Sequence, residues 1–179
     1  FGLAGPVERW RGLRATFHEE VCRDGFDHER NAFVQYYGGK DLDASLLMIP
    51  LVGFLPASDA RVRGTVEAIE RDLMADGFVL RYRTKRHIDG LPPGEAAFLA
   101  CSFWLADNLS LLGRQEDARR LFERVLRLCN DVGLLSEGYD PGNKRMLGNF
   151  PQALSHLALI NTACNLSHDH GPAADRQES

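Results

Sequence analysis

Apolar residues recur at helical spacing in six segments, which span residues 5–21, 41–55, 59–76, 94–112, 115–129 and 150–166. Signals for helix ends support these bounds. Asp59 can cap the third segment, Asp76-Gly77 closes it, and Gly113 ends the fourth. Signals for β-strands are weak, with only short apolar stretches in the connections. The pattern therefore predicts an all-α fold.

The connections between these segments alternate between long and short. Long loops span 22–40, 77–93 and 130–149, whereas the two remaining links are short. Short links join helices that lie antiparallel to one another. All three long loops are therefore expected at one end of the helices.

Charged residues alternate along the chain in the same way. The first, third and fifth segments carry six, eight and seven of them, the second and fourth carry two each, and the sixth carries none. A helix that is apolar all round must be buried on every side. With a repeat of about 55 residues, the alternation predicts helical hairpins with enclosed inner helices. Three such hairpins form about half of an (α/α)6 toroid.

The length and composition set the expected domain organisation. The chain has 179 residues, a net charge of -4 and 44% hydrophobic residues, and its first residue is Phe1. We expect residues 1–166 to form the C-terminal half of a larger catalytic domain, completed by a missing N-terminal half or a second chain. The polar stretch 167–179 is expected to be a disordered tail.

Charge, hydropathy and cysteine spacing exclude several classes of function. The chain has no basic block and no apolar run long enough to span a bilayer, which argues against nucleic acid or a membrane as partner. The four cysteines form no C-x-x-C motif and suggest reduced thiols in a cytoplasmic protein. No metal-ligand spacing is present, and no cofactor is implied. His156, on an apolar helix, is expected to be a hydrogen-bonded core residue.

The long loops carry side chains suited to binding sugars. Arg81-Tyr82 lies in one loop, Glu95 begins an inner helix, and Glu137 lies in the last loop. Aromatic rings stack on the C–H faces of sugars, while arginine and carboxylate groups bind hydroxyls. Paired carboxylates are also what glycoside hydrolysis requires. Each residue has a simpler explanation: Glu95 can stabilise a helix N-terminus, Glu137 can be a solvated loop acid, and Arg81 can pair with a nearby acid.

Four strings also carry a resemblance to a known family. They are DLDASLLMIPLVGFLP, GEAAFLACSFWLADNLSLLGR, NDVGLLSEGYDP and GNFPQALSH. Together they resemble the C-terminal half of glycoside hydrolase family 15, which contains glucoamylases, bacterial trehalases and related α-glucosidases. The similarity runs from about residue 1 to residue 166. It implies an (α/α)6 toroid, in agreement with the alternation of the helices.

The resemblance implies a role for each candidate residue. The family hydrolyses α-glucosides with inversion, using two glutamates. The motif around the general base resembles Ser136-Glu137, so Glu137 is expected to be the base. Arg81 and Tyr82 match a pair that holds the sugar, and Glu95 matches an acidic position that we take as substrate-binding. The general acid falls in a segment upstream of these strings, so this chain alone is expected to be inactive.

Two positions depart from the pattern that this family shows. The chain has Ala96 where glycine is usual, and Gly138 where bacterial members often have an acid. The second departure leaves Glu137 in place and leaves open which residue supports it. A helical-repeat interaction module and a non-catalytic member of the family are the alternatives. The substrate also stays open among trehalose, isomaltose, maltose and starch ends.

Overall fold

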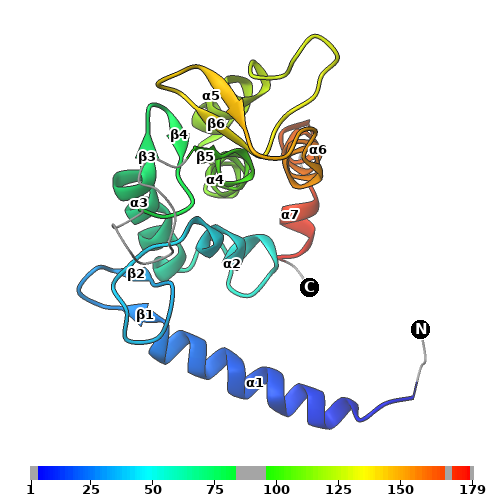
Figure 1. Ribbon diagram of the computed structural model, residues 1–179. Helices are drawn as coiled ribbons and strands as arrows, with labels where there is room; N and C mark the ends of the chain where they lie inside the picture. Colours follow the sequence, from blue (N-terminus) through cyan, green and yellow to red (C-terminus); the bar gives the residue numbers. More distant parts are fainter. Residues whose placement is uncertain (1–3, 84–95, 168–170, 178–179) are drawn as a thin grey trace.

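The computed structural model describes residues 4–83, 96–167 and 171–177. The fold is mainly helical, as the sequence predicted (Figure 1). The five longer helices are α1 (Val7–Asp24), α3 (Ala60–Leu73), α4 (Leu99–Leu111), α5 (Gln115–Leu126) and α6 (Ala153–Ser167). The shorter ones are the 3-10 helix η1 (Ala44–Leu47), α2 (Met48–Leu51) and α7 (Pro172–Asp175).

Short antiparallel strands lie in the connections, which the sequence had not predicted. They are β1 (Phe26–Asp27) with β2 (Ala32–Phe33), β3 (Met74–Ala75) with β4 (Phe78–Val79), and β5 (Ala97–Phe98) with β6 (Gly138–Asp140) and β7 (Arg145–Leu147). They leave the fold class unchanged because each has only two or three residues. The first two pairs are hairpins within one connection each, whereas β5 joins the start of α4 to the hairpin of β6 and β7.

Helix α4 lies at the centre of the molecule and packs against α2, α5, α6 and α7 (Figure 1). Nearly all of its side chains are buried, Phe103 and Leu105 among them. Its polar residues Asp107 and Asn108 are also buried. The predicted enclosure of this inner helix is therefore confirmed. Closure of the helices into a half toroid stays a prediction.

The predicted helix at 41–55 is replaced by the shorter η1–α2 pair. It begins late because the Asp43 carboxylate accepts a hydrogen bond from the Ser45 N–H and caps the first turn. It ends early because Gly53, with a φ of +73°, turns the chain away after the last helical bond, from the Val52 N–H to the Met48 carbonyl. The expected start of a helix near Asp43 is thus confirmed, but not its length.

Helix α3 begins and ends for reasons that the sequence partly foretold. The Asp59 carboxylate accepts a hydrogen bond from the Arg61 N–H at 2.8 Å, which confirms the predicted cap. The helix stops at Leu73 rather than at residue 76. Asp76 and Gly77 both have positive φ, 50° and 81°, and form the two-residue turn between β3 and β4.

Two helices carry apolar faces that nothing in the described residues covers. Helix α1 has no buried residue and projects away from the other helices (Figure 1). Its stripe of Trp10, Leu13 and Phe17 is exposed. In α6, only small residues such as Ala158 are buried, while Leu154, Leu157 and Ile160 are exposed. The sixth predicted segment is therefore enclosed on one side only.

The predicted disorder after residue 166 is wrong for residues 171–177. The Ala173 N–H donates to Asn165 Oδ1 at 3.1 Å, and Arg176 Nη1 donates to the carbonyl of Leu51 at 3.2 Å. The Ala57 N–H donates to Gln177 Oε1 at 2.6 Å. This polar segment is thus held by the carbonyl at the end of α2, by the N–H of Ala57 and by the side chain of Asn165. No helix of the described residues is both long and apolar enough to cross a membrane.

Candidate active site

The pocket that contains the predicted site is assembled by the β5–β6–β7 sheet. In the register of the sheet, Phe98 lies opposite Gly138, and Gly138 lies opposite Leu147. The start of α4 is thereby joined to the last long loop. Next to the sheet is a pocket of about 430 Å³, which is lined by Arg81, Tyr82, Ala96, Phe98, Glu137, Gly138, Leu147, Gly148, Gln152 and Leu154.

Glu137 lies just before β6, and its backbone is held from two directions. Its N–H donates to the carbonyl of Asn149 at 2.9 Å, and its carbonyl accepts from the Leu99 N–H at 3.1 Å. The preceding residue, Ser136, is buried, and its carbonyl accepts from the Ser155 hydroxyl at 2.8 Å. These bonds tie the glutamate to α4, α6 and the segment after β7.

The Glu137 carboxylate is also held. Its Oε2 accepts from the Asn149 backbone N–H at 3.2 Å and from Asn149 Nδ2 at 2.9 Å. The side chain crosses closely over Gly148. A Cβ on Gly148 would lie 2.8 Å from the Cβ of Glu137, and the glycine has a φ of +77°, which other residues rarely adopt. Gly148 and Asn149 together form a cradle for this carboxylate.

Arg81 is anchored to the start of η1 by its backbone and its side chain. The Ala44 N–H donates to the Arg81 carbonyl at 2.7 Å, and Arg81 Nε lies 3.7 Å from Asp43 Oδ2. Asp43 is only 5% exposed, and the same oxygen accepts from Gln35 Nε2 at 3.5 Å. The Arg81 guanidinium carbon lies 5.7 Å from the ring centre of Tyr82. All three long loops thus send residues to this region.

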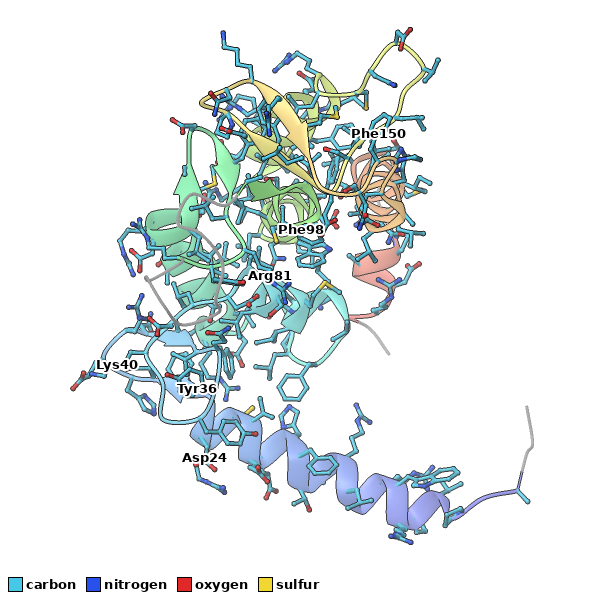
Figure 2. The ribbon with its side chains drawn as sticks, in the orientation of Figure 1. Asp24, Tyr36, Lys40, Arg81, Phe98 and Phe150 are labelled. Carbon is cyan, nitrogen blue, oxygen red and sulfur yellow. The ribbon has the colours of Figure 1, made fainter. Side chains whose placement is uncertain are left out.

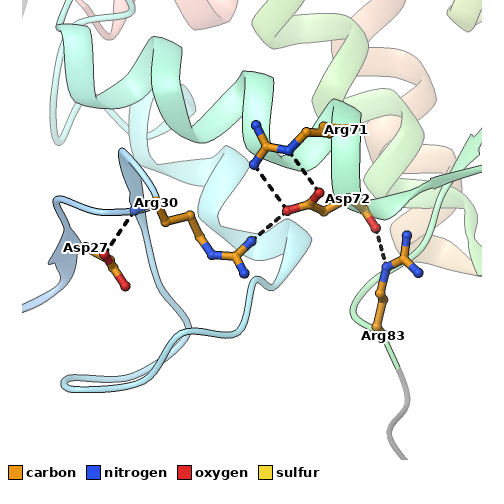
Figure 3. A network of polar contacts seen from close by, with 5 residues as sticks. All are labelled: Asp27, Arg30, Arg71, Asp72 and Arg83. Carbon is orange, nitrogen blue, oxygen red and sulfur yellow. Dashed lines mark hydrogen bonds and ion pairs between the residues drawn. The ribbon is translucent and has the colours of Figure 1, made fainter.

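A second set of polar contacts holds the segment that follows Arg81 (Figure 3). Arg83 Nε donates to the backbone carbonyl of Asp72 at 2.6 Å. The Asp72 carboxylate pairs with Arg30 at 2.6 Å and with Arg71 at 3.0 Å. The Arg71 guanidinium is the main cause of the lowered pKa of Asp72. Arg83 is therefore bound to the end of α3, whereas Arg81 lines the pocket.

The structure brings three of the four predicted residues to one pocket. Arg81, Tyr82 and Glu137 line it together, while Glu95 lies outside the described residues.

Tyr36 is 59% exposed and lies near the C-terminal end of α1, away from the labelled Arg81 and Phe98 (Figure 2). Asp140 forms the turn between β6 and β7, where the Asn143 side chain is the first cause of its lowered pKa.

Sequence reasoning did not find several residues of the site. Asp43, which lies in the predicted helix at 41–55, pairs with Arg81. Phe98, which the sequence did not indicate, also lines the pocket. Gln152 and Asn149 stand among the amides of the last long loop and the string that follows it, where Gln152 lines the pocket and Asn149 bonds to Glu137. Their signal was their place in the strings at 94–112 and 148–156, but strings alone do not show which side chains meet.

The side chain of His156 bonds to backbone groups near the pocket. His156 Nε2 accepts from the Leu135 N–H at 3.3 Å, and its Nδ1 lies 2.7 Å from the carbonyl of Gln152. The proton is therefore assigned to Nδ1, and His156 is hydrogen-bonded as predicted, although it is only partly buried. Within the described residues, no group of three or more His, Cys, Asp or Glu residues could hold a metal ion.

The family model for glycosyl hydrolases family 15 matches residues 1–164. The chain belongs to this family. It is 44% identical over 165 residues to the trehalases of Thermoplasma volcanium and Mycobacterium tuberculosis, a match that covers 92% of the chain in each case. These matches cover 26% and 24% of the two relatives, so the chain spans about a quarter of their length.

Solved glycosidase structures share the fold. A wild-type glycosidase superposes with a TM-score of 0.75 at 23% sequence identity, covering 91% of this chain and 46% of the other. A variant glycosidase in complex with glucose gives the same TM-score at 22% identity. At this level of identity, the likeness concerns the fold alone. It agrees with the helical arrangement around α4.

Proposed function

We propose that this family 15 chain forms the general-base side of the active site of an inverting α-glucoside hydrolase that acts on trehalose. The observation that carries the proposal is the pocket in which Arg81, Tyr82 and Glu137 meet. Trehalose is favoured over maltose, isomaltose and starch ends because the relatives named above are trehalases. The reaction needs only water and two carboxyl groups, so no cofactor is assigned.

In this proposal, each pocket residue has one task. The Glu137 carboxylate accepts a proton from a water molecule, which attacks the anomeric carbon from the face opposite the leaving sugar. Arg81 donates hydrogen bonds to the hydroxyls of the glucosyl unit, and Tyr82 offers an aromatic face to it. Glu95 is proposed to bind the sugar as well. Inversion requires a general acid about 6.5–9.5 Å from the base, and a part of the protein outside this chain would supply it.

Replacing Glu137 by glutamine in the full-length protein tests the role of the base. Glutamine keeps the size of the side chain and cannot take the proton, so kcat on trehalose should fall roughly 10² to 10⁴-fold with KM little changed. Glu116→Gln, on the first turn of α5, serves as the control. Proton NMR of the first product should show β-glucose from an α-linked substrate. If the activity of Glu137→Gln stayed within about tenfold of wild type, Glu137 would not be the general base.

The same measurements separate the remaining possibilities. A full-length protein that hydrolyses no α-glucoside in a panel of trehalose, maltose, isomaltose and starch would be a non-catalytic family member. The family match over residues 1–164 argues against the alternative of a helical-repeat interaction module. Inactivity of this chain alone and its cytoplasmic location are further parts of the proposal.

A further inference from the structure

Glu137 and Asn149 hold each other through bonds in both directions. The Glu137 N–H donates to the Asn149 carbonyl at 2.9 Å. In return, the backbone N–H and the side-chain Nδ2 of Asn149 both donate to Glu137 Oε2, at 3.2 and 2.9 Å. A single residue therefore fixes both the main chain and the carboxylate of the glutamate.

The two donors reach only one of the two carboxylate oxygens. Within the described residues, no hydrogen bond to Oε1 is present, whereas Oε2 accepts two. Such an arrangement restricts rotation of the carboxylate and leaves one defined oxygen to accept a proton. Glu137 itself lines the pocket. Gly148 makes the arrangement possible because it has no Cβ to meet the glutamate side chain.

We propose that Asn149 is the positioning residue of the general base, and that its Nδ2 directs Oε1 of Glu137 towards the attacking water. The inference rests on the proposed function of Glu137. It also supplies the support that Gly138, in place of an acid, had left open. A base displaced by about 1 Å can lose roughly a hundredfold in rate, so the bond from Asn149 Nδ2 should contribute to kcat by keeping the carboxylate in place.

The side chain of Asn149 can be tested apart from its backbone. Substitution leaves the backbone N–H and carbonyl in place, so the segment after β7 keeps its bonds to Glu137. Asn149→Ala removes the side-chain donor. Asn149→Asp keeps the shape but places a carboxylate oxygen beside Oε2, where two like charges repel each other. The two variants should therefore differ in activity although they disturb packing little.

In the full-length protein, kcat on trehalose should fall roughly tenfold to a hundredfold in Asn149→Ala, and further in Asn149→Asp. KM should stay within about threefold, since the substrate is not touched. Asn143→Ala is the matched control. It removes a similar bond, from Asn143 Nδ2 to Asp140 Oδ2 at 2.7 Å, on the same hairpin but outside the pocket. Its kcat should stay within about twofold of wild type.

A double variant shows whether Asn149 acts through Glu137. Once Glu137→Gln has removed the base, adding Asn149→Ala should cause no further loss, because residues that act as a unit are not additive. A full additional loss would overturn the inference. So would an inactive Glu137→Gln protein together with Asn149 variants whose kcat is within about threefold of wild type. An active Glu137→Gln protein would overturn the proposed function itself. If Asn149→Ala does not fold, Asn149→Asp decides, since it fills the same volume.

Discussion

Ala96 occupies the space that a side chain on Gly138 would need. A Cβ on Gly138 would lie 2.9 Å from the Cβ of Ala96 and 3.4 Å from the carbonyl oxygen of Ala97. Both Ala96 and Gly138 line the pocket beside Glu137. They are also the two positions at which the sequence departs from the pattern of its family. The two departures expected from the resemblance therefore fall on residues that would collide if Gly138 carried a side chain.

Gly138→Ala should destabilise the full-length protein by roughly 1–3 kcal/mol, because the added methyl group overpacks a site that cannot move freely. The double variant Gly138→Ala, Ala96→Gly should recover most of that loss, since the space at 96 is then open. Chemical unfolding of the two single variants and the double variant measures this coupling. Gly12→Ala is the control, since its Cβ would meet nothing within 4 Å. If the effect of the double variant equals the sum of the two single effects, the positions are independent.

The sequence predicted the long helices well because their ends carry local signals. Asp59 caps α3 and Gly113, with a φ of +77°, follows α4, as expected. The segment at 41–55 was overestimated because its apolar residues continue to Leu55, whereas the backbone leaves the helical conformation at Gly53. The order of 171–177 was missed because it depends on distant backbone partners such as Leu51 and Ala57.

Part of the site could also be found from sequence. The motifs pointed to Arg81, Tyr82 and Glu137, which line one pocket. The contacts to Asp43 and Asn149 could not be found in this way. Arg81 and Asp43 are 38 positions apart in the chain, and only the folding of two loops onto η1 brings them within 3.7 Å. The position of Glu137 depends on the pairing of β5 with β6. These strands are too short to show a pattern in the sequence.

Asp43→Asn should weaken substrate binding by changing how Arg81 is held. The asparagine oxygen can still accept from the Ser45 N–H and cap η1, but the charge opposite Arg81 is lost. Because Arg81 is largely exposed, we expect only a modest rise in KM for trehalose, roughly threefold to tenfold, with kcat changed less. Steady-state kinetics of the full-length protein measures both constants.

Asp59→Asn is the matched control for this experiment. Asp59 also caps a helix, and its carboxylate also pairs with an arginine, Arg61, at 2.7 Å. It lies outside the residues that line the pocket. The KM of the Asp59 variant should therefore equal that of wild type. If both variants raised KM alike, loss of a capped ion pair in general would explain the effect, and the specific role of Asp43 would be wrong.

Asp107 should make the stability of the protein depend on pH between about 4 and 6. It is 4% exposed, and burial raises its pKa from 3.8 to about 6, although hydrogen bonds from Asn165 and Thr162 oppose the shift. The folded state therefore binds a proton more tightly than the unfolded state. The stabilisation from this proton is complete below pH 4 and is lost as the pH rises through 6.

Asp107→Asn removes this titration and keeps an oxygen that can accept from Asn165 Nδ2. At pH 7, the variant should be more stable than wild type by an amount on the order of 3 kcal/mol. The difference should vanish near pH 4, where Asp107 is protonated. Unfolding midpoints of both proteins between pH 4 and pH 8 provide the measurement. A constant difference across that range would contradict the assigned cause.

The exposed face of α6 gives a prediction about the rest of the catalytic domain. Leu154, Leu157 and Ile160 are 53%, 57% and 56% exposed in this chain. Soluble proteins seldom leave such a row of large apolar side chains uncovered. The chain also spans about a quarter of the length of its curated relatives. We therefore expect another part of the full-length protein to cover this face.

Leu157→Gln in the full-length protein tests whether that cover exists. If a second segment packs on α6, the substitution removes buried apolar area and leaves an amide without water, so stability should fall by roughly 2–3 kcal/mol. Val132→Gln is the control, because Val132 is 69% exposed and lies in the loop 130–149. Its effect should stay within about 0.5 kcal/mol. Thermal or denaturant unfolding compares the two variants with the parent protein. Equal, small effects at both positions would mean that the α6 face stays in water in the complete molecule, and the half-toroid interpretation would then be wrong.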